Sequence, residues 1–212
     1  MRYLLSLLII LTCFIANSQD LDYPDYRSKK DNFSKMREKD LRGDIAAFAM
    51  AGIDESTGKL PLKNIPMTDY GTNFMKFEGN KISVTVKAGI FNPAKHKLSY
   101  YDEKFLVKID SKPYYGNYGK VPKTVIESVT IYIDKDTVAI PPVAFSDLYN
   151  PSFIYKDVSG TERTLNSVYF SPDKRTMYVY MLNKEDKGGY EVTWVVQDKK
   201  YLRRVVDFGL LK

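Results

Sequence analysis

The sequence predicts an all-β protein, most simply a two-sheet antiparallel β-sandwich of about eight to ten strands that ends in a C-terminal β-meander. Short runs of alternating apolar and polar residues recur along the 212-residue chain. Turn signals separate these runs at intervals of about eight to twelve residues, as in all-β sandwiches. No long amphipathic helical stripe interrupts them. A partly open barrel is the alternative arrangement of the same strands.

The first 18 residues predict a secretory signal peptide. Arg2 gives a short positive start, residues 3–15 are predominantly apolar, and small residues stand at positions 16 and 18. The apolar run is shorter than the about 20 residues that cross a bilayer as a helix. We therefore expect cleavage after Ser18 and an exported protein, periplasmic or extracellular, with no transmembrane segment after cleavage.

Cys13 is the only cysteine, and it lies inside the predicted signal peptide. A lipoprotein anchored through Cys13 is the alternative, but Thr12 stands where such a signal carries a small residue. Once Cys13 is removed, the mature chain has no disulfide, no thiol nucleophile and no cysteine-ligated metal. We expect neither a cofactor nor a metal site.

The charge balance favours no particular partner. The formal net charge of +6 falls to +5 when Arg2 leaves with the signal peptide. The positive residues are spread along the chain, so a solvated surface is the simplest interpretation, although an anionic glycan, a lipid surface or an acidic protein would also be attracted. Export and the absence of a nucleic-acid reading motif argue against a nucleic-acid partner. Nothing in the sequence indicates an oligomeric state.

The mature chain divides into a leader and one domain. Residues 19–43 are polar and basic, which predicts a mobile N-terminal leader. Residues 44–212 have the length of a single β-sandwich domain. The domain is predicted to begin with a strand pair, at residues 45–53 and 60–65. Pro61 and Pro66 confine the second strand to a sheet edge, because proline cannot donate to the ladder.

The middle of the chain predicts several more strands. From residue 74 the β pattern strengthens, with a turn at residues 78–80. One half-buried strand is marked by apolar residues that alternate with polar ones, namely Ile82, Val84 and Val86. Further strands are predicted at residues 105–109, 125–133 and 137–140. In the run 125–133, alternation puts Ile126 on the face opposite Val129, Ile131 and Ile133.

The meander is the strongest pattern in the chain. It comprises three alternating runs, at residues 176–182, 190–197 and 201–208. A fourth run, at residues 165–170, leads into them. Trp194 belongs to the apolar face of its run, and a three-residue loop at 198–200 or an equivalent bulge would add Leu202 and Val206 to that face. Arg204 would then lie opposite Trp194. Stacking of the guanidinium on the indole would contribute about 0.5–2 kcal/mol.

Two constellations could carry hydrolytic chemistry. His96, the only histidine, could form a Ser-His-Asp triad, although it lies in a basic loop and no Gly-x-Ser-x-Gly elbow is present. Paired carboxylates could hydrolyse a glycan. The candidates are Asp102-Glu103, Asp134 with Asp136, Glu185-Asp186, and the strand residues Glu127 and Glu191. A surface histidine and turn or ion-paired carboxylates are the simpler interpretations.

The segment from Lys112 to Lys120 is the strongest candidate for a binding site. Its candidate contact residues are Lys112, Tyr114, Tyr115, Tyr118 and Lys120. Tyrosine offers a large amphipathic contact area, while glycine and asparagine let a loop adapt to a partner. In the alternative interpretation, Tyr114 and Tyr115 fold back over the core and the glycines only make a turn. Residues 100–101 and 147–150 could neighbour this loop.

These observations favour an exported, soluble, non-catalytic binding protein whose tyrosine-rich loops contact a protein or glycan partner, in the manner of an inhibitor or immunity protein. A carboxylate-dependent hydrolase of envelope or extracellular polysaccharide is the alternative, and a structural envelope component is a third hypothesis. Two carboxyl groups about 5–10 Å apart in a cleft would favour the hydrolase.

Overall fold

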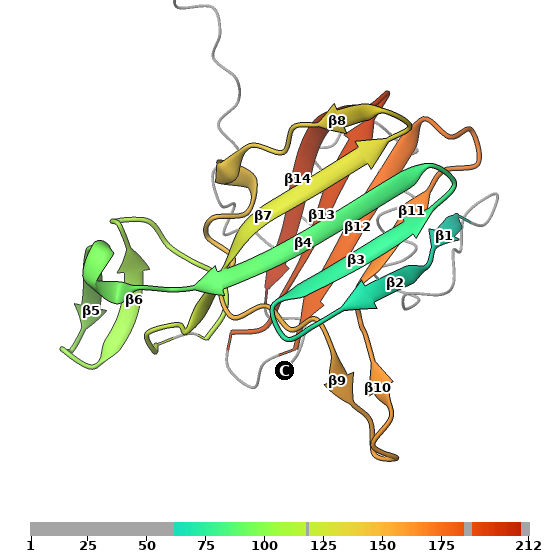
Figure 1. The fold of residues 1–212 in the computed structure, drawn as a ribbon. Helices are drawn as coiled ribbons and strands as arrows, with labels where there is room; N and C mark the ends of the chain where they lie inside the picture. The colour runs from blue at the N-terminus through green and yellow to red at the C-terminus, as the bar shows by residue number, and fades with distance from the viewer. Residues whose placement is uncertain (1–61, 118, 185–187, 209–212) are drawn as a thin grey trace, which may run out of the picture.

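The computed structural model describes residues 62–117, 119–184 and 188–208. Two antiparallel sheets of five strands each make a sandwich-like fold, as predicted (Figure 1). The described residues contain no α-helix, and none of their helical turns is long and apolar enough to cross a membrane. The predicted signal peptide, the leader and the first predicted strand, at residues 45–53, lie outside the described residues.

The first sheet has the strand order β2-β3-β4-β7-β8. Its strands are β2 (Met67–Tyr70), β3 (Phe74–Gly79), β4 (Ile82–Ile90), β7 (Thr124–Ile133) and β8 (Asp136–Val138). Alternation along β4 buries Ile82, Val84 and Val86, while Ser83 and Thr85 are half-buried, which confirms the predicted strand face. The sheet therefore presents one apolar face to its partner.

A bulge in β7 corrects the predicted assignment of faces. Lys87 pairs with Ser128, but Ala88 pairs with Ile126, so Glu127 has no partner in this register. The extra residue returns Ile126 to the core face, where it is buried together with Val129 and Ile131. Simple alternation had placed Ile126 on the opposite face. The bulge was not predictable from β7 alone, because it depends on how β7 pairs with β4.

The second sheet contains the meander. Its order is β1-β11-β12-β13-β14, formed by β1 (Lys63–Ile65), β11 (Ser167–Phe170), β12 (Thr176–Asn183), β13 (Tyr190–Gln197) and β14 (Lys200–Phe208). The four predicted runs are therefore confirmed as neighbouring antiparallel strands. β1 lies at the edge, as its flanking prolines predicted.

The β13–β14 register is set by a bulge. Gln197 pairs with Lys200 around a two-residue turn, and the register shifts between Val195 and Val196, so that Arg203 and Tyr201 pair with these two residues. This is the predicted alternative to a three-residue loop, and it brings Arg204 opposite Trp194. The shift also changes the predicted face of one residue. Leu202 was expected on the Trp194 face but is exposed at the bulge, and Tyr201 packs against the core in its place.

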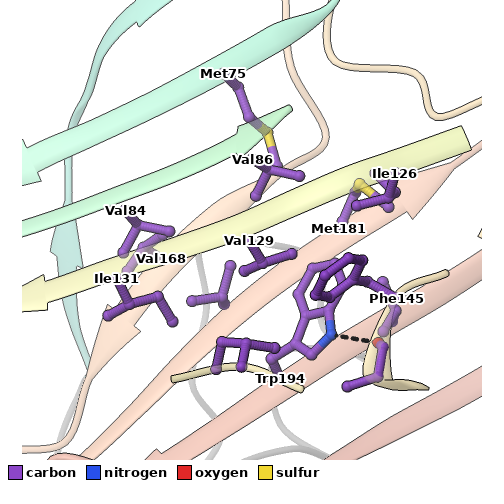
Figure 2. Close-up of a cluster of buried hydrophobic side chains, with 14 of the residues drawn as sticks. Met75, Val84, Val86, Ile126, Val129, Ile131, Phe145, Val168, Met181 and Trp194 are labelled. Carbon is purple, nitrogen blue, oxygen red and sulfur yellow. Dashed lines mark hydrogen bonds between the residues drawn. The ribbon is translucent and has the colours of Figure 1, made fainter. Parts of the chain in front are cut away.

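The core lies between the two sheets (Figure 2). Val84 and Ile131 contribute from the first sheet, and Val168 and Met181 from the second. Trp194 is completely buried, and its indole Nε1 donates to the carbonyl oxygen of Ala144 at 2.7 Å. Burying an aromatic of this size contributes about 1.5–3 kcal/mol or more, so Trp194 is a main element of the core.

Two small hairpins project from the sandwich (Figure 1). They are β5 (Leu98–Tyr101) with β6 (Phe105–Ile109), and β9 (Tyr155–Lys156) with β10 (Glu162–Arg163). Single 3₁₀ turns occur at η1 (Pro93–Lys95) and η2 (Pro142–Ala144). The described residues contain fourteen strands against the eight to ten predicted, and the predicted strand at residues 105–109 is β6, which belongs to a projecting hairpin rather than to a main sheet. The hairpin strands β9 and β10 were missed because two-residue strands carry no alternation pattern.

Candidate functional site

The tyrosine-rich loop connects β6 to β7, and its first two rings point into the protein. Tyr114 and Tyr115 are buried, Lys112 and Lys120 are exposed, and Tyr118 lies outside the described residues. Tyr114 packs edge-on against Tyr149 with ring centroids 5.6 Å apart. The two rings thus fold back and pack into the core, as in the alternative interpretation of this segment. The binding role of the loop stays a prediction.

The loop is held by the segment that follows η2. The Tyr115 N–H donates to the Asp147 carbonyl oxygen, and the Tyr149 N–H donates to the Tyr115 carbonyl oxygen, both at 2.9 Å. On its other side, the Leu106 N–H donates to Gly119 at 3.1 Å, which joins the loop to the β5–β6 hairpin. Residues 147–150 therefore adjoin the loop, and Leu106 of β6 connects it to the hairpin that also carries residues 100–101.

Arg204 has a carboxylate partner that the sequence did not reveal. Its Nη1 and Nη2 donate to the two Asp147 carboxylate oxygens at 2.5 and 2.8 Å, and the Arg204 side chain is only 2% exposed. Its Cζ also lies 6.0 Å from the centroid of the Tyr115 ring, at the distance of a cation–π contact. A buried bidentate pair of this kind fixes the η2 segment to the sheet.

His96 forms a pair rather than a triad. Its Nδ1 lies 2.7 Å from Asp110 Oδ2, and its ring stacks on Phe91 at 4.7 Å. The hydrogen bond to His96 is the main cause that lowers the pKa of Asp110. Within the described residues, no hydroxyl group bonds the other imidazole nitrogen. The arrangement therefore lacks the nucleophile that triad chemistry requires.

The predicted carboxylate clusters have structural partners or exposed positions. Asp134 and Asp136 both accept from Lys199 Nζ at 2.9 Å, and this lysine lowers the pKa of Asp134. A glycosidase acid instead needs a raised pKa. Glu191 is buried and accepts from the Tyr180 hydroxyl at 2.7 Å. The remaining candidates are either exposed, as Asp102, Glu103 and Glu127 are, or outside the described residues, as Glu185 and Asp186 are.

A cleft of about 790 Å³ lies beside the β9–β10 hairpin, and we call it the hairpin cleft. It is lined by tyrosine, amide, hydroxyl and charged side chains together with the apolar side chains of Phe153 and Ile154. Its lining includes the polar residues Tyr70, Thr124, Asn150, Ser152, Tyr155, Glu162 and Asn183. A volume of this size is typical of small-ligand sites.

Two tyrosines present accessible rings to the hairpin cleft. Tyr70 is 44% exposed and Tyr155 is 41% exposed. The Tyr70 hydroxyl donates to Glu162 Oε2 at 2.8 Å, which links β2 to β10 across the cleft and raises the pKa of Tyr70. The exposed faces of these rings are available for stacking.

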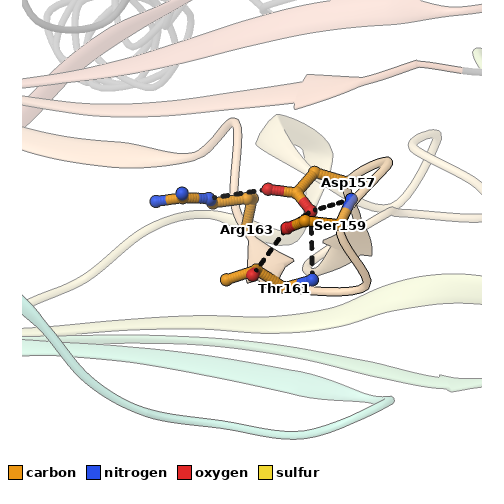
Figure 3. Close-up of polar contacts among 4 residues, drawn as sticks. All are labelled: Asp157, Ser159, Thr161 and Arg163. Carbon is orange, nitrogen blue, oxygen red and sulfur yellow. Dashed lines mark hydrogen bonds and ion pairs between the residues drawn. The ribbon is translucent and has the colours of Figure 1, made fainter.

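The hairpin that borders the cleft has an ordered tip (Figure 3). Asp157 Oδ1 accepts from the Ser159 hydroxyl at 2.5 Å and from the Thr161 N–H at 3.0 Å. Its Oδ2 accepts from Arg163 Nε at 3.2 Å. These bonds lower the pKa of Asp157 to about 2, with the Ser159 hydroxyl as the largest favourable cause. The carboxylate therefore holds the tip in one conformation.

Asn150 forms another wall of the cleft. Its side-chain Oδ1 accepts from the backbone N–H groups of Lys123 and Thr124 at 2.9 and 3.1 Å. Its backbone has a φ of 46°, in the left-handed region that asparagine tolerates better than most residues. The start of β7 is thereby fixed against the segment that leads into the hairpin.

Asn183 is the unusual residue of the hairpin cleft. It continues the core-facing alternation of Met177, Val179 and Met181 at the last position of β12, and it is 0% exposed. In the part of the chain that the structure describes, neither its Nδ2 nor its Oδ1 has a hydrogen-bond partner. An unmade hydrogen bond on a buried polar group costs about 1–3 kcal/mol.

The sequence carried a signal for Asn183 that the prediction did not use. The predicted strand ended at residue 182, so Asn183 counted as a loop residue. Extending the alternation by one position would have shown a polar side chain on a core face. Tyr70 and Tyr155 gave no such signal, because the cleft joins β2, β9 and β12 from distant parts of the chain.

Within the described residues, no group of three or more histidine, cysteine or acidic side chains could hold a metal ion. Comparisons with protein-family models, curated proteins and solved structures find no match to this chain.

Proposed function

We propose that this is an exported, non-catalytic binding protein that recognises a glycan in the hairpin cleft. The observation that carries the proposal is Asn183, a fully buried amide without a partner among the described residues, at the boundary of a cleft that also offers two accessible tyrosine rings. A ligand that hydrogen-bonds this amide would recover free energy that the folded protein alone loses.

The composition of the cleft suits a sugar. Sugar rings have apolar C–H faces that stack on aromatic side chains, and their hydroxyl groups match amide and hydroxyl partners. Tyr70 and Tyr155 supply the first type of contact, and Thr124, Ser152 and Asn183 the second. The proposed contacts are therefore different tyrosines from those of the Lys112–Lys120 segment. Three lysines also line the cleft against one carboxylate, so a neutral or acidic glycan fits better than a cationic one.

Binding rather than hydrolysis is supported by the carboxylates. Among the described residues that line the cleft, Glu162 is the only acid, and it already accepts from Tyr70. Both mechanisms of glycoside hydrolysis need two carboxyl groups about 5–10 Å apart. Export is supported by the pattern of residues 1–18, and intact-mass measurement of exported protein tests cleavage after Ser18.

The test is binding of residues 19–212 to an array of soluble oligosaccharides, followed by calorimetry on the hits. Tyr155→Ala should weaken binding about tenfold, because one stacking contact is lost. Tyr100→Ala is the matched control, since Tyr100 is 46% exposed on the other hairpin. Asn183→Leu should abolish binding without lowering the free energy of unfolding, because an apolar side chain needs no partner at this site.

Three outcomes would contradict the proposal. The first is an array without hits, and the second is equal affinity of the Tyr155→Ala variant and the wild-type protein. The third is the release of new reducing ends from a bound oligosaccharide, which would favour the hydrolase instead.

A further inference from the structure

A second pocket, of about 700 Å³, lies at the end of the sandwich opposite the hairpin cleft, and we call it the turn pocket. The turns β3–β4, β7–β8, β11–β12 and β13–β14 surround it, so both sheets contribute (Figure 1). Its floor consists of core side chains, including Ile82, Ile133 and Val196. The pocket is therefore an opening onto the apolar interior between the sheets.

The rim of the turn pocket carries an excess of positive charge. Five lysine and arginine residues line it against two aspartates. Arg175 and Lys199 are engaged, because Arg175 pairs with Asp198 and Lys199 with Asp134. The other three rim cations, Lys63, Lys81 and Lys174, are exposed, and Lys81 contributes to the lowered pKa of Asp134 without a direct ion pair among the described residues. Their ammonium groups are exposed around an apolar floor.

The two engaged pairs also connect the turns that form the rim. Arg175 and Asp198 join the β11–β12 turn to the β13–β14 turn through two hydrogen bonds of 2.9 and 2.7 Å. Lys199 crosses from the second sheet to the first and bonds both Asp134 and Asp136.

We propose that the turn pocket binds an amphipathic anion, namely a single acyl chain with a carboxylate head group. The chain lies on the floor formed by the core side chains, and removing it from water provides the main driving force. The carboxylate lies among Lys63, Lys81 and Lys174. The volume is within the range of about 300–1,000 Å³ that small-molecule sites occupy. This site is independent of the glycan proposal, because it uses other residues at the other end of the molecule.

The test uses dodecanoate as the probe, in competition with a fluorescent dansyl-labelled undecanoic acid on residues 19–212. We expect saturable displacement by dodecanoate, and at least about tenfold weaker displacement by dodecan-1-ol, which lacks the charge, and by acetate, which lacks the chain. The affinity for dodecanoate should fall as salt is raised from low to physiological concentration.

The variant Lys81→Gln/Lys174→Gln should weaken dodecanoate binding about tenfold with an unchanged melting temperature, because both lysines are exposed. Lys104→Gln, an exposed lysine in the β5–β6 turn, is the control and should bind like the wild type. Equal displacement by dodecanoate and dodecan-1-ol would overturn the proposal. So would an unchanged affinity of the double variant, or sedimentation with phosphatidylglycerol vesicles without any binding of free dodecanoate.

Discussion

At the scale of single residues, the Arg204–Asp147 pair illustrates what a register can and cannot predict. Alternation along β13 and β14 placed Arg204 opposite Trp194, and the structure has this pairing. The carboxylate partner lies 57 residues away in sequence, on the segment after η2. No local pattern relates Arg204 to Asp147, so the ion pair was beyond sequence reasoning.

Removal of Asp147 should reveal the difference between buried and exposed ion pairs. Asp147→Ala takes the bidentate partner from a guanidinium that is almost completely buried, and such changes cost about 3–5 kcal/mol. Asp198→Ala is the matched control, because the bidentate Arg175–Asp198 pair is exposed to solvent and its removal should change the free energy of unfolding much less. Urea unfolding of both variants measures the two costs. A similar loss of unfolding free energy in the two variants would show that the burial of Arg204 does not increase the cost of removing its carboxylate partner.

Asp157 predicts a pH dependence that is confined to the β9–β10 tip. Its folded pKa of about 2 lies below the ordinary value of 3.8, so the ionised form stabilises the tip. This stabilisation is complete above the ordinary value and is lost as the pH falls from 3.8 through about 2. Carbon NMR of the carboxyl groups should show Asp157 titrating near the lower value.

The Ser159→Ala variant tests the cause of this shift. The Ser159 hydroxyl is the largest favourable contributor, so its loss should move the Asp157 midpoint upward. Asp173 has a comparable hydrogen bond from Ser171 and a lowered pKa, and its midpoint should not change in Ser159→Ala. An Asp157 midpoint that stays near 2 in this variant would assign the shift to Arg163 and the backbone instead.

At the scale of elements, long alternating runs were predictable and interruptions were not. The meander strands follow from period-two alternation because they are consecutive neighbours in one sheet, and alternate residues of β11–β14 contribute to the core between the sheets. The bulge at Glu127 could not be predicted, because it depends on how β7 pairs with β4. The Lys112–Lys120 segment offered two interpretations, and only the partners of Tyr114 and Tyr115 distinguish them.

Gly116 should be the most sensitive position of that segment. Its φ is 98°, and a Cβ there would lie 2.2 Å from the Tyr149 carbonyl oxygen, which belongs to the backbone and cannot move easily. Gly116→Ala should therefore cost at least about 3 kcal/mol, from backbone strain and steric overlap together. The measurement is urea unfolding monitored by circular dichroism.

Gly160 provides a control with the same type of backbone conformation. Its φ is 80°, but no atom lies within 4 Å of a Cβ built there. Gly160→Ala should cost only about 1 kcal/mol, and the cost should be local to the β9–β10 hairpin. A Gly116→Ala variant as stable as Gly160→Ala would mean that the loop and the Tyr149 segment separate readily.

At the scale of the whole molecule, the sequence predicted the fold class but not the position of the candidate site. The hairpin cleft assembles residues from β2, β9, β10 and β12 together with the segments before β7 and β9. Such a site exists only once the topology is known. Asn183 is the exception, because its polar side chain breaks an apolar pattern that the sequence already displays.

The large core cluster shared by both sheets should make the sandwich unfold in one step. Trp194 is the only tryptophan in the chain, it is fully buried, and side chains of both sheets belong to its cluster. Its fluorescence therefore reports on the contact between the sheets, while far-UV circular dichroism reports on the strands themselves. In urea the two signals should give coincident transitions, because the cluster that contains Trp194 takes buried side chains from both sheets.

Hydrogen exchange under native conditions provides the complementary measurement. The β5–β6 and β9–β10 hairpins project from the sandwich, so their amides should exchange through local opening, well before those of β4, β12 and β13. A fluorescence transition at lower urea than the dichroism transition would contradict the single core. It would mean that the sheets separate while their strands persist, and that the turn pocket, which both sheets line, opens before the protein unfolds.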